Sequence, residues 1–157
     1  VEMRPQQSSA NEVVKECIDL LSIELERERV AWKLELAPDL PQAYVDPGVL
    51  AEVFINLIRN GIRFMDKNGY MHIQTYESDQ NIQTDFRIPI LQGKIRDPET
   101  LFMPFDETTQ DFGLSLSLRL LKDMGGLFSY SKQDEHMVFS ISLLKAMKVD
   151  AQEGPVS

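Results

Sequence analysis

The chain has 157 residues, which suits one domain with a hydrophobic core of its own rather than two. Its 25 acidic and 16 basic residues give a net charge of −9, so nucleic acids and anionic membrane surfaces are poor partners. No signal peptide opens the sequence, no stretch reaches the roughly 18 consecutive apolar residues of a transmembrane helix, and the single Cys17 excludes an internal disulfide. These features predict a cytoplasmic protein.

A polar stretch at the start of the sequence leads into an amphipathic helix. The polar residues Val1–Ala10 predict a linker. From Asn11 onward, apolar residues recur at spacings of three and four, as on one face of a helix, and Asn11 is a favourable N-cap residue. Cys17 lies on this apolar face, which predicts a buried thiol. The charged run up to Arg29 is typical of the solvated end of the helix.

Two short strands precede the best defined helix of the sequence. They are expected at Trp32–Leu36 and Gln42–Val45. Asp46 followed by Pro47 is typical of an N-cap and the first helical residue, and a broad apolar face then continues to about Met65.

The second half of the chain predicts two hairpins separated by a loop and a helix. Pro89 indicates that the second strand of the first hairpin ends early or lies at a sheet edge. The helix stops at Gly125-Gly126, a typical C-terminal signal, and the chain ends in a tail that we expect to be disordered. The segments are the strands Tyr70–Tyr76 and Ile82–Ile90, the loop Leu91–Thr109, the helix Gly113–Asp123, the strands Leu127–Ser131 and Met137–Leu143, and the tail 148–157.

This order of elements predicts an α/β fold of two layers. A mixed, mostly antiparallel sheet is expected to carry about three helices on one face. We expect residues 11–147 to form this domain, with the linker 1–10 before it and the tail 148–157 after it.

A column of polar residues follows one face of the second helix. Glu52, Asn56 and Asn60 are spaced by four residues, and Arg63 lies close to them. Taken alone, such a column is typical of the solvated side of an amphipathic helix. Amide oxygens, however, also suit a hard cation such as Mg²⁺, because they coordinate it without losing a proton.

Two stretches in this order resemble the sequence boxes of a known ATPase family. Residues 53–64, VFINLIRNGIRF, resemble the asparagine box, and residues 101–126 resemble the phenylalanine box, lid, second glycine box and following helix. The family is that of the ATP-binding domains of two-component sensor histidine kinases, which are GHKL-type ATPases with the Bergerat fold. The likeness covers about residues 11–145 and implies a Bergerat-type sandwich.

The resemblance implies roles for the polar column. Asn60 corresponds to the asparagine that ligates Mg²⁺, Asn56 to one that helps to hold the phosphates, and Arg63 to a basic residue that contacts them. The nucleotide-binding residues implied in this way are Asn56, Asn60, Arg63, Phe64, Gly113 and Leu114.

The first glycine box departs from the family pattern. The family has an aspartate here that hydrogen-bonds the adenine amino group, and glycines follow it. The corresponding position holds Ile90, or Leu91 after a shift of one residue, and Gln92 stands nearby. Neither apolar side chain accepts a hydrogen bond, and an unpaired buried amino group costs about 1–3 kcal/mol.

The second glycine box also departs from the pattern. Asp111, Gly113 and Ser115 occupy its three glycine positions. Asp111 brings a carboxylate to the place of the phosphates, and as a favourable N-cap residue it can satisfy the free amides of the helix by itself. The acidic Asp106 and Glu107 in the lid add repulsion. These changes predict weak or no binding of Mg-ATP.

The sequence is compatible with two functions. In the first, the chain is a degenerate histidine kinase domain that acts in signalling by contacts with a helical dimerisation and phosphoacceptor domain of the same protein, or with the receiver domain of a response regulator. In the alternative, it is a functional kinase module that transfers the γ-phosphoryl group of Mg-ATP to a histidine on that dimerisation domain. A third hypothesis is a relative of the serine kinases that act as anti-sigma factors.

Other residues receive structural interpretations. His72 is expected within a strand and His136 in a turn at a strand start, and neither lies in a phosphoacceptor motif. A more apolar ligand is a further hypothesis for a pocket lined by Ile90, Leu91 and Phe112. The methionines expected to fill the core are Met65, Met71, Met103, Met124 and Met137.

Overall fold

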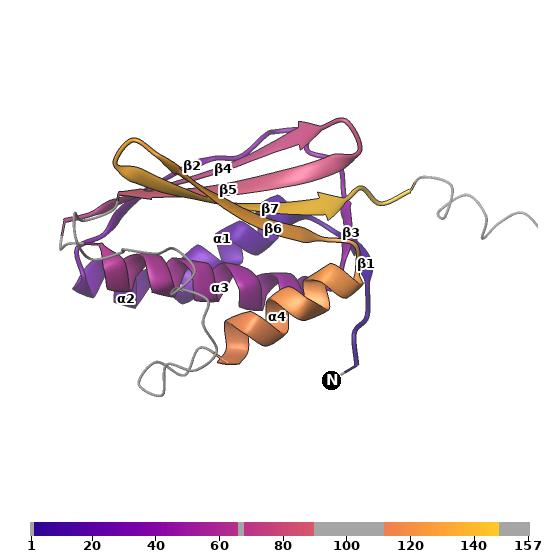
Figure 1. Ribbon diagram of the computed structural model, residues 1–157, viewed down its shortest axis with the longest axis horizontal. Helices are drawn as coiled ribbons and strands as arrows, with labels where there is room; N and C mark the ends of the chain where they lie inside the picture. Colours follow the sequence, from indigo (N-terminus) through magenta and orange to yellow (C-terminus); the bar gives the residue numbers. More distant parts are fainter. Residues whose placement is uncertain (1, 66–67, 90–111, 148–157) are drawn as a thin grey trace, which may run out of the picture.

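A five-stranded sheet forms one layer of the structure, and helices on one of its faces form the other (Figure 1). The computed structural model describes residues 2–65, 68–89 and 112–147. The helices are α1 (Ala10–Leu20), α2 (Ser22–Arg27), α3 (Pro47–Phe64) and α4 (Phe112–Asp123). The strands of the large sheet are β2 (Ala31–Glu35), β4 (Tyr70–Ser78), β5 (Asn81–Pro89), β6 (Leu127–Gln133) and β7 (His136–Leu144).

The order of the sheet is β2-β4-β5-β7-β6. The β2–β4 pair is parallel and the other three pairs are antiparallel, so the expected mixed, mostly antiparallel sheet is confirmed. The edge position considered for the Pro89 strand is wrong, because β5 lies between β4 and β7. Pro89 is the last residue of β5, where its missing N–H does not interrupt the ladder.

Residues near the start of the chain form a small second sheet. Strand β1 (Gln6–Ser8) pairs antiparallel with β3 (Ala43–Val45), although a linker is expected there from the sequence. The Ser8 hydroxyl donates a hydrogen bond to the Val45 carbonyl at 2.9 Å. The sequence of β1 lacks the alternation of apolar and polar residues that indicates a strand, because β1 is held by backbone pairing with β3 rather than by an apolar face.

The expected N-cap at Asn11 is wrong, because the N-cap of α1 lies two residues earlier. Ser9 is the N-cap, and its hydroxyl accepts a hydrogen bond from the Glu12 amide at 3.2 Å. Asn11 instead donates to the Ala37 carbonyl at 2.7 Å and accepts from the Thr75 hydroxyl at 2.7 Å. Asn11 therefore connects α1 with the exit of β2 and with β4.

The first helix is divided in two rather than continuous. Leu21, with φ −96° and ψ 8°, separates α1 from α2. This turn keeps Leu21 and Leu25 in the core, at 1% and 0% exposure, although Leu20 and Ile23 beside them are exposed. Cys17 is buried at 1% exposure, as expected.

Helix α3 is the main helix against the sheet, and its capping is as predicted. The Asp46 carboxylate accepts hydrogen bonds from the amides of Gly48 at 2.8 Å and Val49 at 3.3 Å. The Phe54 side chain, which is fully buried, lies 5.2 Å from the ring of Phe86 on β5. Such an aromatic contact adds to the apolar burial that holds the two layers together.

The end of α4 also agrees with the prediction. Gly125 has φ +85°, and the amides of Gly125 and Gly126 donate to the carbonyls of Lys122 and Leu121, both at 2.9 Å. This is the Schellman arrangement in which a glycine in the left-handed region ends a helix.

Of the five methionines expected in the core, Met103 lies outside the described residues. The other four are buried, as predicted: Met65, Met71, Met124 and Met137. Within the described ranges, no helix has the length and apolar character needed to cross a membrane.

Candidate functional site

The polar column lies on α3 as its spacing predicts. Asn60 is buried at 4% exposure, Asn56 is half-buried, and Arg63 is exposed. The Asn56 amide nitrogen donates to the Glu52 carbonyl of the same helix at 2.9 Å. The nitrogen of this amide is therefore held by the helix, and the oxygen is the atom directed away from that bond.

Next to Asn60, helix α3 approaches the sheet closely at Gly61. A β-carbon at Gly61 would lie 3.0 Å from Cε of Met71 on β4 and 3.3 Å from Cγ2 of Ile88 on β5. Ile88 is 2% exposed and is the second-last residue of β5. The end of β5, two residues before Ile90, is therefore adjacent to the asparagine column in space.

Only part of the expected glycine-box residues can be placed. Ser115 lies in the second turn of α4 and is half-buried. Gly113 is in the first turn of the same helix, which begins directly after Asp111. Asp111 itself lies outside the described residues, and so do Ile90, Leu91, Gln92, Asp106 and Glu107. The side chains of Phe64, Phe112 and Leu114 also lie outside the described part of the structure. The interpretations of these positions stay predictions.

An apolar groove between α3 and α4 is a feature that the sequence did not predict. Its volume is 350 Å³, and Val49, Leu116 and Leu120 form its apolar lining, with Asp46 and Glu52 beside them. Leu116 is 50% exposed. The sequence carries a usable signal for this groove, because leucines at every second position of a helix cannot all face the core.

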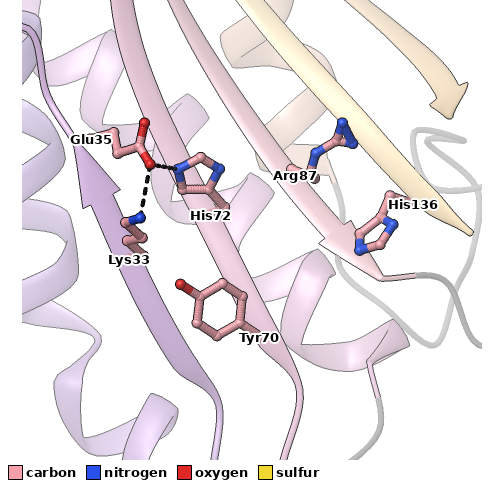
Figure 2. Close-up of a pocket in the computed structure, with 6 residues that line it drawn as sticks. All are labelled: Lys33, Glu35, Tyr70, His72, Arg87 and His136. Atoms are coloured by element: carbon pink, nitrogen blue, oxygen red, sulfur yellow. Dashed lines mark ion pairs between the residues drawn. The ribbon is translucent and has the colours of Figure 1, made fainter.

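A polar cluster on the open face of the sheet is a second feature that the sequence did not predict. Figure 2 shows that its side chains come from four strands and stand on the same side of the sheet. Glu35 lies between two basic groups, with its Oε1 atom 3.0 Å from Lys33 Nζ and 3.0 Å from His72 Nε2. The members of this cluster are Lys33, Glu35, Tyr70, His72, Arg87 and His136.

The register of the strands explains this cluster. Lys33 of β2 pairs with His72 of β4, and His72 pairs with Arg87 of β5, so the three form one row across the sheet. The hydrogen bond and the charge of Lys33 hold the pKa of the Glu35 carboxyl below its usual value. His72 lies within a strand, as predicted, and His136 is the first residue of β7. Among the described residues, no group of three metal-ligating side chains occurs.

Comparison with known proteins gives sequence relatives along most of the chain. The chain is 25% identical over 143 residues to sporulation kinase E of Bacillus subtilis, which covers 88% of the chain and 19% of that protein. It is 30% identical over 142 residues to the sensor histidine kinase HprS of Escherichia coli, which covers 86% of the chain and 30% of that protein. The chain thus spans less than a third of either relative's length. No family model matches it.

Comparison with solved structures gives the same fold at low identity. The nucleotide-free catalytic domain of histidine kinase ThkA matches with a TM-score of 0.77 and 21% identity, over 91% of this chain and 99% of that one. ThkA in complex with the response regulator TrrA matches over 92% of this chain and 42% of that one, with 21% identity and a TM-score of 0.74. Full-length ShkA in complex with AMPPNP matches at 17% identity over 93% of this chain and 32% of that one, with a TM-score of 0.75.

Proposed function

We propose that this chain, which is a relative of sensor histidine kinase catalytic domains in sequence and in fold, is a degenerate member that binds Mg-ATP weakly or not at all and acts in signalling through protein contacts. The observation that carries the proposal is a contrast within one pocket. The scaffold and the asparagine column on α3 are kept, whereas the sequence has Ile90 and Asp111 where the family needs an adenine acceptor and a glycine.

The contact at Gly61 supports the importance of position 90. Ile88 packs against α3 beside Asn60, so the chain leaves β5 next to the asparagine column. The resemblance puts the family's adenine acceptor at position 90, two residues after Ile88 in the sequence. Isoleucine has no acceptor, and leaving the adenine amino group unpaired costs about 1–3 kcal/mol, or about ten- to a hundredfold in affinity.

The start of α4 supports a second loss. In the sequence, Asp111 directly precedes Phe112, the first residue of α4, and aspartate is a favourable N-cap residue. A carboxylate there competes with phosphate groups for the free amides of the first turn, and its charge repels them. Since this change and the one at Ile90 concern different parts of the nucleotide, their costs should add approximately.

The groove between α3 and α4 supports a role in protein contacts. Its apolar lining is exposed at Leu116, and the carboxylates of Asp46 and Glu52 stand beside it. An amphipathic helix with an apolar stripe and basic flanking residues would match both features. We therefore propose the helical dimerisation and phosphoacceptor domain as the main partner and a response regulator receiver domain as a second one.

The burial of Asn60 on the same helix face as Asn56 favours the functional kinase as an alternative. Two neutral amide oxygens are acceptable ligands for Mg²⁺, although nucleotide phosphates would have to supply further oxygens. In that case, Asn60 would hold the ion, Asn56 and Arg63 would orient the phosphates, and the bound Mg²⁺ would neutralise charge on the transferred phosphoryl group.

Calorimetric titration with Mg-ATP separates the two functions. We expect no heat and no thermal shift at millimolar nucleotide, whereas saturation at a hundred times Kd would add about 2.7 kcal/mol of stability. The double variant Ile90→Asp, Asp111→Gly should gain binding, which Asn60→Ala should then abolish and Gln74→Ala, on the other face of the sheet, should not. Micromolar binding by the unmodified chain that Asn60→Ala removes would establish the kinase function instead.

A further inference from the structure

The polar cluster on the open sheet face holds more positive than negative charge, although the chain as a whole carries −9. Lys33 and Arg87 are permanently charged near neutral pH, and Glu35 supplies one negative charge. Both histidines of the chain, His72 and His136, lie in this one cluster.

The positive charge of Arg87 is not balanced by a carboxylate among the described residues. Its guanidinium group donates to the Gln133 side-chain oxygen at 3.0 and 3.5 Å, a neutral partner that fixes its position without neutralising it. Asp85 is the nearest acid on the same strand, two residues away, and its Oδ2 atom accepts from the Tyr76 hydroxyl at 3.0 Å. The guanidinium group is therefore held in place and available to an anion.

The imidazole of His72 is also incompletely satisfied. Its Nε2 atom is buried and lies 3.0 Å from Glu35 Oε1, but this contact lacks the direction of a hydrogen bond. Glu35 is shared with Lys33, so one carboxylate serves two basic groups. His72, Arg87 and His136 line the same hollow, which is therefore the place for an additional acceptor (Figure 2).

We propose that this cluster binds a small free oxyanion, of the size of sulfate or phosphate, on the face of the sheet opposite α3. The hollow has a volume of 260 Å³, which suits a single small anion better than a nucleotide. Extended polyanions are disfavoured because Glu35 and Asp85 stand within or beside the cluster and the chain is acidic overall. Bidentate contact by arginine, together with imidazole N–H groups, matches the oxygens of such an ion.

Sulfate is the appropriate probe, because its charge does not change between pH 5 and 8. We expect sulfate, compared with chloride at equal ionic strength, to shift the C2-proton NMR signals of both histidines in a saturable way. The two signals can be assigned with the variant His136→Gln.

Two substitutions that remove the same charge provide the decisive comparison. Arg87→Gln should lower sulfate affinity about tenfold, whereas Arg59→Gln, on α3, should leave it unchanged, because Arg59 pairs with Glu24 in the helical layer. If Arg87→Gln does not fold, Lys33→Gln on the exposed edge strand should weaken binding in the same direction. Equal shifts with sulfate and chloride, or equal losses in the variants on both faces, would overturn the proposal.

Discussion

The same substitution should change stability in opposite directions at two threonines that face each other in the sheet. Thr75 on β4 pairs directly with Thr84 on β5, and both are buried, at 2% and 0% exposure. The Thr75 hydroxyl donates to Asn11 and accepts from the Ala37 amide at 3.0 Å. The Thr84 hydroxyl has no hydrogen-bond partner among the described residues.

Replacement by valine keeps the shape of each side chain and removes only the hydroxyl function. Thr75→Val removes two hydrogen bonds and leaves the Asn11 oxygen and the Ala37 amide without them, so we expect a loss of about 2–3 kcal/mol. Thr84→Val removes a hydroxyl that is desolvated without compensation, so we expect a gain of about 1–2 kcal/mol. The two variants should therefore differ by about 3–5 kcal/mol, on the same values.

Urea unfolding followed by the fluorescence of the single Trp32 measures both changes. Equal m-values would show that only stability has changed. The variant Asn11→Ala should reduce the effect of Thr75→Val in a double-mutant cycle, because one of the two hydrogen bonds is then already absent. Similar midpoints for Thr75→Val and Thr84→Val would refute this reasoning about the two hydroxyl groups.

Three further predictions concern the cap of α3, the buried thiol and the end of α4. Burial acts to raise the pKa of Asp46, but backbone hydrogen bonds from Arg4, Val49 and Gly48 outweigh this effect and lower the pKa below 3.8. The Asp46 carboxylate should therefore stabilise the fold above about pH 4, and this stabilisation should be lost as the pH falls through the lowered pKa. Asp46→Ala should cost about 1–2 kcal/mol at pH 7 and weaken the acid dependence of urea midpoints. Burial, with smaller effects of Glu16 and Glu52, raises the pKa of the Cys17 thiol from 9.0 to about 12. Iodoacetamide should therefore label Cys17 only as fast as the protein unfolds, and the stability of the fold should decrease as the pH rises from about 9 through about 12. Rapid labelling of the folded chain at pH 8 would contradict this. Gly125→Ala should lower the stability of the fold by about 1–2 kcal/mol, because φ is +85° and the new Cβ would lie 2.5 Å from Leu144 Cδ1. Thermal unfolding should show that Leu144→Ala restores part of this lost stability.

Much of the local structure could be predicted because its signals act within a few residues. Asp46 caps α3 through amides two and three positions away, and Gly125 ends α4 through carbonyls of the preceding turn. The spacing of Asn56 and Asn60 likewise places both on one helix face before any tertiary contact is known. These residues, and the order of helices and strands that led to the two-layer fold, depend on periodicity and capping alone.

Other features depend on which segments meet in space. Asn11 was predicted as the N-cap of α1, but Ser9 fills that position, and Asn11 bonds to Ala37 and Thr75 instead. The sequence shows Pro89 at the end of a strand but cannot say that β7 pairs beside it.

The candidate sites divide in the same way. The sequence by itself determined the polar column on α3, because it follows from residue identity at a given spacing, and the replacement of the family's adenine and phosphate residues stays a prediction. Only the tertiary structure decided that Ile88 packs at Gly61 beside that column, and that Lys33, His72 and Arg87 form a row on the opposite face of the sheet. Strand order and register are set by the packing of the whole core, and a shift of one residue would turn every one of these side chains to the other face.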